Sequence, residues 1–190
     1  RRDSLDDKIL KSIKKKESCG AHADVVDVIH KYYRKEFVCA GLKENSWYYF
    51  SSDFGKWKQT EQGHELRRRL SDDIVDIYQY YANKYKLMKG DDPDSDDYDK
   101  YESYNKHCYM VILKLKDGTY KDKLMKECKE KFYDSEFNNN INTNLDLVGL
   151  NNCVIDLKCQ VGEETKIMFR EGIPDDYITI SMGYELPLER

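Results

Sequence analysis

The apolar and aromatic side chains of residues 63–88 recur every three or four positions, and this pattern constrains the fold more than any other in the sequence. The members of this stripe are Leu66, Leu70, Ile74, Ile77, Tyr81, Tyr85 and Met88. Such spacing places them on one face of an α-helix, and Gly90 follows as a C-terminal cap. We therefore expect a single long helix over 63–88, with a hydrophobic core against its apolar face.

Four other stretches have helical spacing. Residues 4–16 form the first, with Ser4 as its N-cap. The second begins near Asp24, and its expected buried face consists of Val25, Val28, Ile29 and Tyr32. The third covers 98–115, although its β-prone run 109–113 leaves a strand as the alternative, and the fourth covers 124–132.

The remaining segments indicate β structure. A short strand is expected at 37–40, and the aromatic runs 47–50 and 56–59 flank turn-like residues in which Gly55 supplies a positive φ. Asparagine-rich residues 138–144 read as a loop, and further strands are expected at 154–157, 167–170 and 177–181. The fold class predicted is α+β: mainly helical with an embedded β-hairpin and a small C-terminal β region. Residues 1–20 are interpreted as an N-terminal helical arm or linker, and 21–190 as one domain that contains an acidic connector at 90–97.

Charge is distributed unevenly along the chain. Residues 1–90 carry 19 Lys/Arg against 14 Asp/Glu, whereas residues 134–190 carry 4 against 11. A basic region can mark a nucleic-acid footprint, and opposite charges at the two ends can also attract neighbouring subunits head to tail. Ordinary solvated faces are the third interpretation, because most charge runs have no other role.

The sequence offers little for catalysis, metal binding or membrane insertion. It has no phosphate-binding loop, no G-x-S-x-G and no H-E-x-x-H, and no apolar run approaches the roughly 20 residues of a membrane span. Cys19 and His22 have ligand-like spacing, with His30 and Cys39 downstream, but no second tight pair completes a zinc site. The six cysteines are therefore expected to be reduced thiols in an intracellular protein. The sequence starts at Arg1 without an initiator methionine, as expected of a piece of a longer polypeptide.

The C-terminal third, together with the aromatic hairpin, carries a set of short motifs. Their residues are Asn152, Asp156, Arg170, Pro174, Asp176, Tyr177, Gly183 and Tyr184. In these motifs the chain resembles the helicase-associated domain of viral primase–helicases, which precedes the superfamily-3 helicase in poxvirus-type proteins of large DNA viruses. Cys153 stands where the family usually has Gly, so Asn152 is expected to take the left-handed conformation at this turn.

The resemblance implies a non-catalytic domain that acts in DNA replication between a primase and a helicase module. It would support assembly of a ring, hexameric in the full-length protein, and guide single-stranded or forked DNA to the motor. ATP binding and hydrolysis would belong to the parent protein, with no catalytic, cofactor or metal site in this chain. The implied location is the host cytoplasm or the virion, without membrane partners. The alternatives are a pure assembly module without DNA affinity and, less favoured, a metal-dependent nuclease.

The candidate DNA contacts are basic residues of three segments and the hairpin aromatics. They are Arg67, Arg68, Arg69, Lys56, Lys58, Lys14, Lys15 and Lys16, with Trp57 or Tyr49 as a base-stacking surface. Basic side chains neutralise phosphates, and exposed aromatics stack on bases. The opposing interpretation is that the arginines pair with local acids such as Asp72 and Asp73, and that the aromatics are core.

Overall fold

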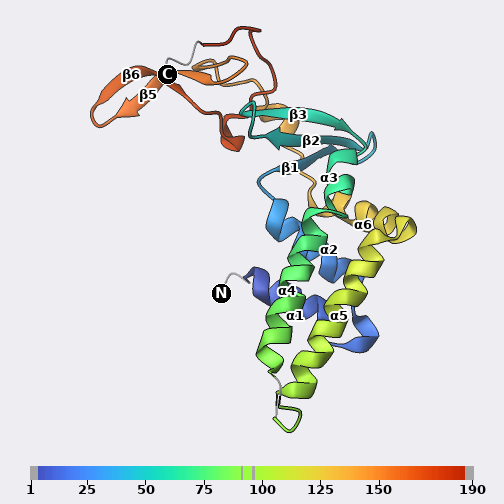
Figure 1. Ribbon diagram of the computed structural model, residues 1–190. Coiled ribbons are helices and arrows are strands. Elements are labelled where there is room, and N and C mark those ends of the chain that lie inside the picture. The colour runs from blue at the N-terminus through green and yellow to red at the C-terminus, as the bar shows by residue number, and fades with distance from the viewer. Residues whose placement is uncertain (1–3, 91, 96, 187–190) are drawn as a thin grey trace. The chain divides into compact units, whose positions relative to one another are not determined.

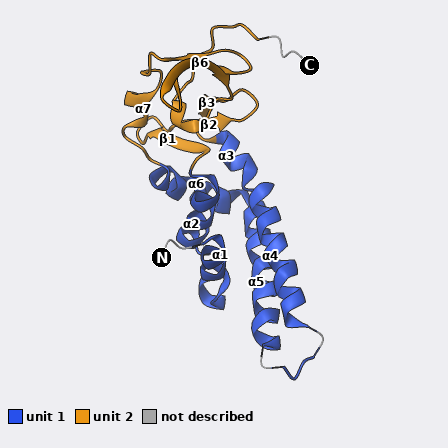
Figure 2. Cartoon of the chain, turned by 90° about the vertical axis from the view of Figure 1, so that its left-hand side faces the viewer, with its two compact units in different colours: residues 1–34, 64–132 blue, residues 35–63, 133–190 orange. Residues whose placement is uncertain are grey.

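The computed structural model describes residues 4–90, 92–95 and 97–186 (Figure 1). The chain divides into two compact units, each made of two separate stretches (Figure 2). Unit 1 comprises residues 1–34 and 64–132, and unit 2 comprises residues 35–63 and 133–190. Unit 1 is helical and unit 2 holds the sheets, which confirms the α+β class. Among the described residues, no helix has the length and hydropathy that a membrane span requires.

Unit 1 is a bundle of α-helices in which α4 and α5 form a long antiparallel pair (Figures 1 and 2). Its helices are α1 (Leu5–Ile13), α2 (His22–Tyr33), α3 (His64–Arg69), α4 (Asp73–Lys89), α5 (Tyr98–Lys116) and α6 (Gly118–Lys131), with a 3-10 turn at Lys16–Ser18. Its core is largely apolar, but it contains a buried hydrogen bond between the Ser12 and Tyr78 hydroxyls, 2.8 Å apart, and the buried His107, whose Nδ1 lies 2.6 Å from the Ile13 carbonyl oxygen. The helical interpretation of 98–115 is confirmed. Ser4 caps α1 as predicted, and accepts the N–H of Asp7.

The single helix expected over 63–88 is wrong, because the chain breaks between α3 and α4. The N–H of Ser71 bonds to Arg68 three residues back, which closes the last turn of α3. Asp72 then has φ −107° and ψ −87°, outside the helical region, and α4 begins after it. Acidic residues at 72, 73 and 76 suit the positive N-terminal end of α4. Leu70 and Ile74 are buried on both sides of the break, so the apolar stripe continues through it.

Two smaller expectations for unit 1 need correction. Helix α2 begins at His22 rather than near Asp24. Tyr32, expected in the core, is 47% exposed, while its neighbour Tyr33 is buried and donates its hydroxyl hydrogen bond to Asp73. Burial, followed by this carboxylate, raises the pKa of Tyr33. The acidic connector is described only in part, because residues 91 and 96 lie outside the described residues.

Unit 2 contains two antiparallel three-stranded sheets. The first has the order β1 (Phe37–Gly41), β2 (Ser46–Ser51), β3 (Lys56–Glu61), and the second has β4 (Leu147–Gly149), β5 (Val154–Val161), β6 (Glu164–Arg170). Phe50 lies opposite Trp57 in the hairpin, and their rings meet edge to face with centroids 5.7 Å apart. Gly55 has the predicted positive φ, 59°. The aromatic pairing expected across the hairpin is therefore present.

Trp57 joins the hairpin to the C-terminal stretch of unit 2. Its indole N–H donates to the carbonyl of Pro174 at 2.8 Å, and its backbone N–H donates to Ile178 at 2.8 Å. Its ring contacts Phe137 with centroids 5.1 Å apart, and Phe137 in turn contacts Tyr177. The two stretches of unit 2 thus share one aromatic core.

The backbones at Gly55 and Gly172 approach so closely that neither can carry a side chain without movement. A Cβ on Gly172 would overlap the carbonyl oxygen of Gly55, and a Cβ on Gly55 would lie 2.8 Å from the Gly172 nitrogen. Next to this contact the Lys56 ammonium donates to the carbonyls of Phe54 and Leu150. We call the contacts of residues 55–57 with the C-terminal stretch the unit 2 seam.

The C-terminal stretch differs from expectation at four places. Residues 177–181 form no strand, because Tyr177 has φ 53°, and a 3-10 turn at Pro174–Asp176 precedes it. Residues 137–140, assigned to a loop from 138 onward, form the short helix α7 (Phe137–Asn140), and the strand β4 was not expected. Asn152 is not left-handed. Its side-chain amide instead exchanges two hydrogen bonds with the backbone of Leu186.

Replacing Gly172 with alanine is expected to lower the free energy of unfolding by about 1–3 kcal/mol, the usual cost of forcing volume into packed structure. Urea unfolding followed by tryptophan fluorescence measures this effect. Both tryptophans lie buried in unit 2, so the signal reports that unit. The wild-type chain is the reference for this signal. A midpoint of Gly172→Ala equal to that of the wild type would contradict the close approach.

Candidate nucleic-acid interface

The three consecutive arginines all pair with neighbouring carboxylates. Arg67 binds Asp122 at 2.7 Å, and Arg68 binds both Glu65 at 2.8 Å and Asp72 at 3.1 Å. Arg69 reaches Glu65 at 3.2 Å and lies over the ring of Tyr33. The hydrogen bond from Arg68 lowers the pKa of Glu65 against the opposing effect of burial.

Of these arginines, only Arg68 is exposed, whereas Arg67 and Arg69 are half-buried. A phosphate would have to compete with carboxylates already in place. The arrangement matches the interpretation in which this cluster pairs with local acids, including the Asp72 named from the sequence.

The hairpin candidates do not present free groups to a nucleic acid. Lys56 is 4% exposed and bonded to carbonyls, and burial lowers the pKa of its ammonium. Trp57 is 4% exposed and forms part of the seam, so it does not meet the condition of exposure on which base stacking depends. The ammonium of Lys58 lies over the Phe54 ring, 3.3 Å from the centroid. Tyr49 is half-buried and its ring stacks against Phe37.

Lys14, Lys15 and Lys16 differ from the other candidates, because all three are exposed. Within the described part of the chain, their ammonium groups have no ion-pair or hydrogen-bond partner. They follow the C-terminal end of α1, where cations suit the helix dipole. Helix α6 adds Lys123 and Lys126, likewise exposed and unpaired among the described residues. The sequence indicated a lysine-rich helix here, but it could not tell these lysines from Lys131, which pairs with Asp27.

The uneven distribution of charge along the sequence corresponds to a difference in net charge between the two units. Unit 1 holds 24 Lys/Arg and 21 Asp/Glu, a net charge of +3, although six of its acids and no base lie within residues 91–99. Unit 2 holds 8 Lys/Arg and 15 Asp/Glu, a net charge of −7. The net positive charge therefore belongs to the helical unit.

The residues weighed as metal ligands do not form a ligand set. Cys19 is buried, with its thiol directed to the carbonyl of His107, and Cys39 belongs to the other unit. His30 packs on Phe132. Burial raises the pKa of Cys19 and, with Cys19 nearby, raises that of Cys108 to about 12, so neither thiol is a thiolate at neutral pH. In the described ranges, no three His, Cys, Asp or Glu side chains converge as a metal site would need.

The residues that carry the resemblance described in the sequence analysis build a network inside unit 2. The Arg170 guanidinium binds both carboxylate oxygens of Asp176, at 2.7 and 2.8 Å, and its Nε binds Asp156 at 3.2 Å. Asp176 is 7% exposed and also accepts the N–H of Ile173 at 2.9 Å. These hydrogen bonds raise the pKa of Arg170 and fix its charge. The motif therefore ties strand β6 to strand β5 and to the turn that follows.

The other motif residues fasten the end of the chain. Pro174 supplies the carbonyl that accepts the Trp57 indole, and Tyr177 packs on Phe137. The side-chain amide of Asn152 exchanges two hydrogen bonds with the backbone of Leu186. The Tyr184 carbonyl accepts the N–H of Asn151. These positions, with Gly183 at φ 80°, hold residues 174–186 in place without strand structure. Within the described residues the motif thus has a structural explanation.

Replacing Arg170 with methionine is expected to destabilise unit 2 by about 3–5 kcal/mol, the cost of leaving a buried carboxylate without its charge partner. The measurement is urea unfolding followed by tryptophan fluorescence. Lys166→Met on the same strand is the matched control, because its ion pair with Glu164 is exposed and worth about 0–1 kcal/mol. If both variants unfold at the wild-type midpoint, the network does not stabilise the unit.

Comparison with known proteins agrees with these features. Residues 26–187 match the family model described as "D5 N terminal like". "Putative helicase L207/L206" of Acanthamoeba polyphaga mimivirus is 29% identical over 168 residues, which cover 87% of this chain and 16% of that protein. The chain thus spans about a sixth of the length of that relative. The match includes the hairpin, the α4–α5 pair and the Arg170 network, and the resemblance seen in the sequence is confirmed. The chain belongs to the D5 N-terminal-like family.

Proposed function

We propose that this chain is the non-catalytic, helicase-associated domain of a viral primase–helicase, and that it contacts the DNA backbone through the exposed lysines of unit 1. Support comes from the family, from a relative named as a helicase and from the unpaired cations at positions 14–16. The parent protein would supply the superfamily-3 motor, with its ATP binding and hydrolysis. The domain would help a hexameric ring to assemble and guide DNA towards that motor.

The unpaired state of Lys14, Lys15 and Lys16 is the observation that carries the DNA contact. An ammonium already bound to a carboxylate must lose that partner to bind phosphate, whereas an unpaired one releases only counterions and water. These three lysines in succession concentrate positive charge in one short segment. The Arg67–Arg69 cluster, with its carboxylate partners, is the weaker candidate.

Changing Lys14, Lys15 and Lys16 together to alanine is expected to weaken binding of fluorescent single-stranded DNA about tenfold near 50 mM salt. The slope of log affinity against log salt should fall by about 2, since each lost phosphate contact on a single strand contributes about 0.7. The measurement is an anisotropy titration with single-stranded, forked and duplex DNA at about 50 and 200 mM salt.

The matched control removes the same charge from unit 2 by changing Lys43, Lys158 and Lys166 to alanine. Lys158 and Lys166 already pair with Asp146 and Glu164. This variant should bind like the wild type. Equal loss in both variants would indicate a net-charge effect only, and absence of wild-type binding at low salt would reject the DNA contact.

A second candidate function, assembly through protein contacts alone, is favoured by the exposed hairpin of β5 and β6. Ile167 is 64% exposed and Phe169 is 55% exposed on one face of β6, and Met168 is 39% exposed on the other. A strand with apolar side chains exposed on both faces, at the edge of its sheet, is unusual in a monomer. Burial against another subunit would cover it.

If assembly uses this hairpin, sedimentation velocity should show concentration-dependent association that Ile167→Ser with Phe169→Ser abolishes. Lys166→Ser is the control on the same strand, since it leaves the apolar side chains in place. A chain that sediments as a monomer at all concentrations would rule out self-assembly through this surface alone.

A further inference from the structure

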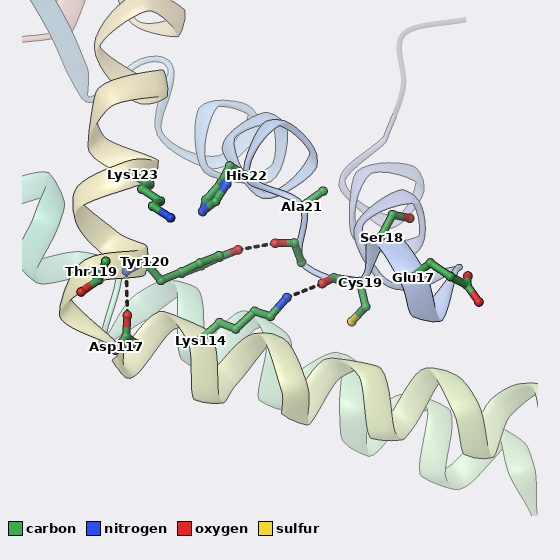
Figure 3. Close-up of a pocket in the computed structure, with 11 residues that line it drawn as sticks. Glu17, Ser18, Cys19, Ala21, His22, Lys114, Asp117, Thr119, Tyr120 and Lys123 are labelled. Atoms are coloured by element: carbon green, nitrogen blue, oxygen red, sulfur yellow. Dashed lines mark hydrogen bonds between the residues drawn. The ribbon is translucent and has the colours of Figure 1, made fainter.

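A pocket of about 330 Å³ opens in unit 1 beside the start of α2 (Figure 3). Basic and aromatic side chains from three helices line it: His22 of α2, Lys114 of α5, and Tyr120 and Lys123 of α6. Figure 3 shows the His22 ring, the Tyr120 ring and the Lys123 side chain gathered on one side of it. The volume is at the lower end of the range for small-molecule sites.

The loop that leads into α2 is held firmly against this pocket. The Lys114 ammonium donates to the carbonyl of Cys19 at 2.6 Å, and the Tyr120 hydroxyl donates to that of Gly20 at 2.7 Å. Gly20 has φ 68°, and a Cβ there would lie 3.2 Å from the Lys114 side chain. The shape of the pocket is therefore set before any ligand arrives.

Two polar features of the pocket are left without a partner. Ala21 occupies the N-cap of α2 and offers no side chain to the first backbone N–H groups of this twelve-residue helix. The Nε2 atom of His22 is buried and has no hydrogen-bond partner among the residues that the structure describes. Its ring is fixed against Tyr120, with centroids 4.8 Å apart. A buried polar atom without a partner costs about 1–3 kcal/mol, which a ligand at this position would remove.

The charges around the pocket favour an anion. Asp117 and Glu17 are the acids among its lining residues. Asp117 already caps α6, where it accepts the N–H of Tyr120 at 2.7 Å, and Glu17 is exposed to solvent. Lys123 is exposed, with no partner among the described side chains, and Lys114 lies opposite. The N-terminal end of α2 adds partial positive charge.

We propose that this pocket binds a phosphate group, held by the N-terminal end of α2, the His22 Nε2 and the ammonium of Lys123. Phosphate oxygens accept hydrogen bonds from all three groups, so a phosphate would supply the hydrogen-bond acceptor that is missing from the pocket. The group can come from free phosphate, from a nucleotide, or from the backbone of DNA. The proposal depends on the geometry of the pocket and does not require the DNA contact at Lys14–Lys16.

The test is an NMR titration of the full chain, in which the His22 imidazole nitrogens are followed as pyrophosphate or a thymidine oligonucleotide is added at constant ionic strength. The sequence has 4 histidines, so His22→Gln assigns the signal. A saturable shift with a dissociation constant of about 1 mM or tighter is expected. No saturable shift with either probe overturns the proposal.

Two variants distinguish binding in the pocket from a general effect of positive charge. Lys123→Met should weaken binding about tenfold, equivalent to about 1.4 kcal/mol, whereas Lys126→Met on the same helix should leave it unchanged. Ala21→Asp should weaken binding while raising the unfolding midpoint, because an aspartate at the N-cap takes the place of the anion. Equal effects of Lys123→Met and Lys126→Met, or unchanged binding in Ala21→Asp, would reject the assignment.

The two probes distinguish the source of the phosphate. A response to pyrophosphate alone supports a free phosphate or nucleotide, and a response to the oligonucleotide supports the DNA backbone. Oligonucleotide binding that depends on Lys14–Lys16 but not on Lys123 would leave the proposed DNA contact intact and, without a pyrophosphate response, would reject the pocket. Pyrophosphate binding without any DNA affinity would reject the DNA contact and retain the pocket.

Discussion

The architecture of unit 2 depends on the indole of Trp57. This unit is made of two stretches of chain separated by the helices 64–132, and at Trp57 a backbone bond to Ile178, an indole bond to Pro174 and a ring contact with Phe137 join them. Because residues 171–186 form no strand, they have no ladder of their own to fix their position. The close backbone approach of Gly55 to Gly172 completes the seam. Because the two backbones are in contact there, the C-terminal stretch cannot shift along the hairpin without a clash.

The family motif and the exposed positive charge have different roles and lie in different units. Arg170 is fully engaged by Asp176 and Asp156, so the shared motif explains how unit 2 holds together. The unpaired lysines at 14–16 lie outside the stretch matched by the family model. Family membership therefore supports the fold and the replication context, while the DNA contact has to be argued from local electrostatics.

Periodicity and turn chemistry predicted most elements, because those signals are local. The break at Asp72 was missed since Leu70 and Ile74 keep the apolar stripe in phase across it. The alternation of Ile178 and Ile180 suggested a strand, but pairing depends on distant backbone, and Ile180 is 63% exposed. The candidate site was also predictable only where the signal is local. The exposure of Lys14–Lys16 follows from the polarity of the surrounding sequence. Nothing near Lys56 in the sequence indicates that its ammonium is bonded to the carbonyl of Leu150.

The division into two units has a consequence for anyone who shortens this chain. The polypeptide passes between the units three times, at residues 34–35, 63–64 and 132–133, so neither unit is a continuous segment. Truncation at residue 132 would remove Phe137, Ile141 and Tyr177, which pack in the same core as residues of β1–β3. In a series of progressively shorter chains, nearly every truncation would therefore prevent folding of at least one unit. To isolate the helical unit, an expression vector would have to encode a short bridge from residue 34 to residue 64 and stop at residue 132.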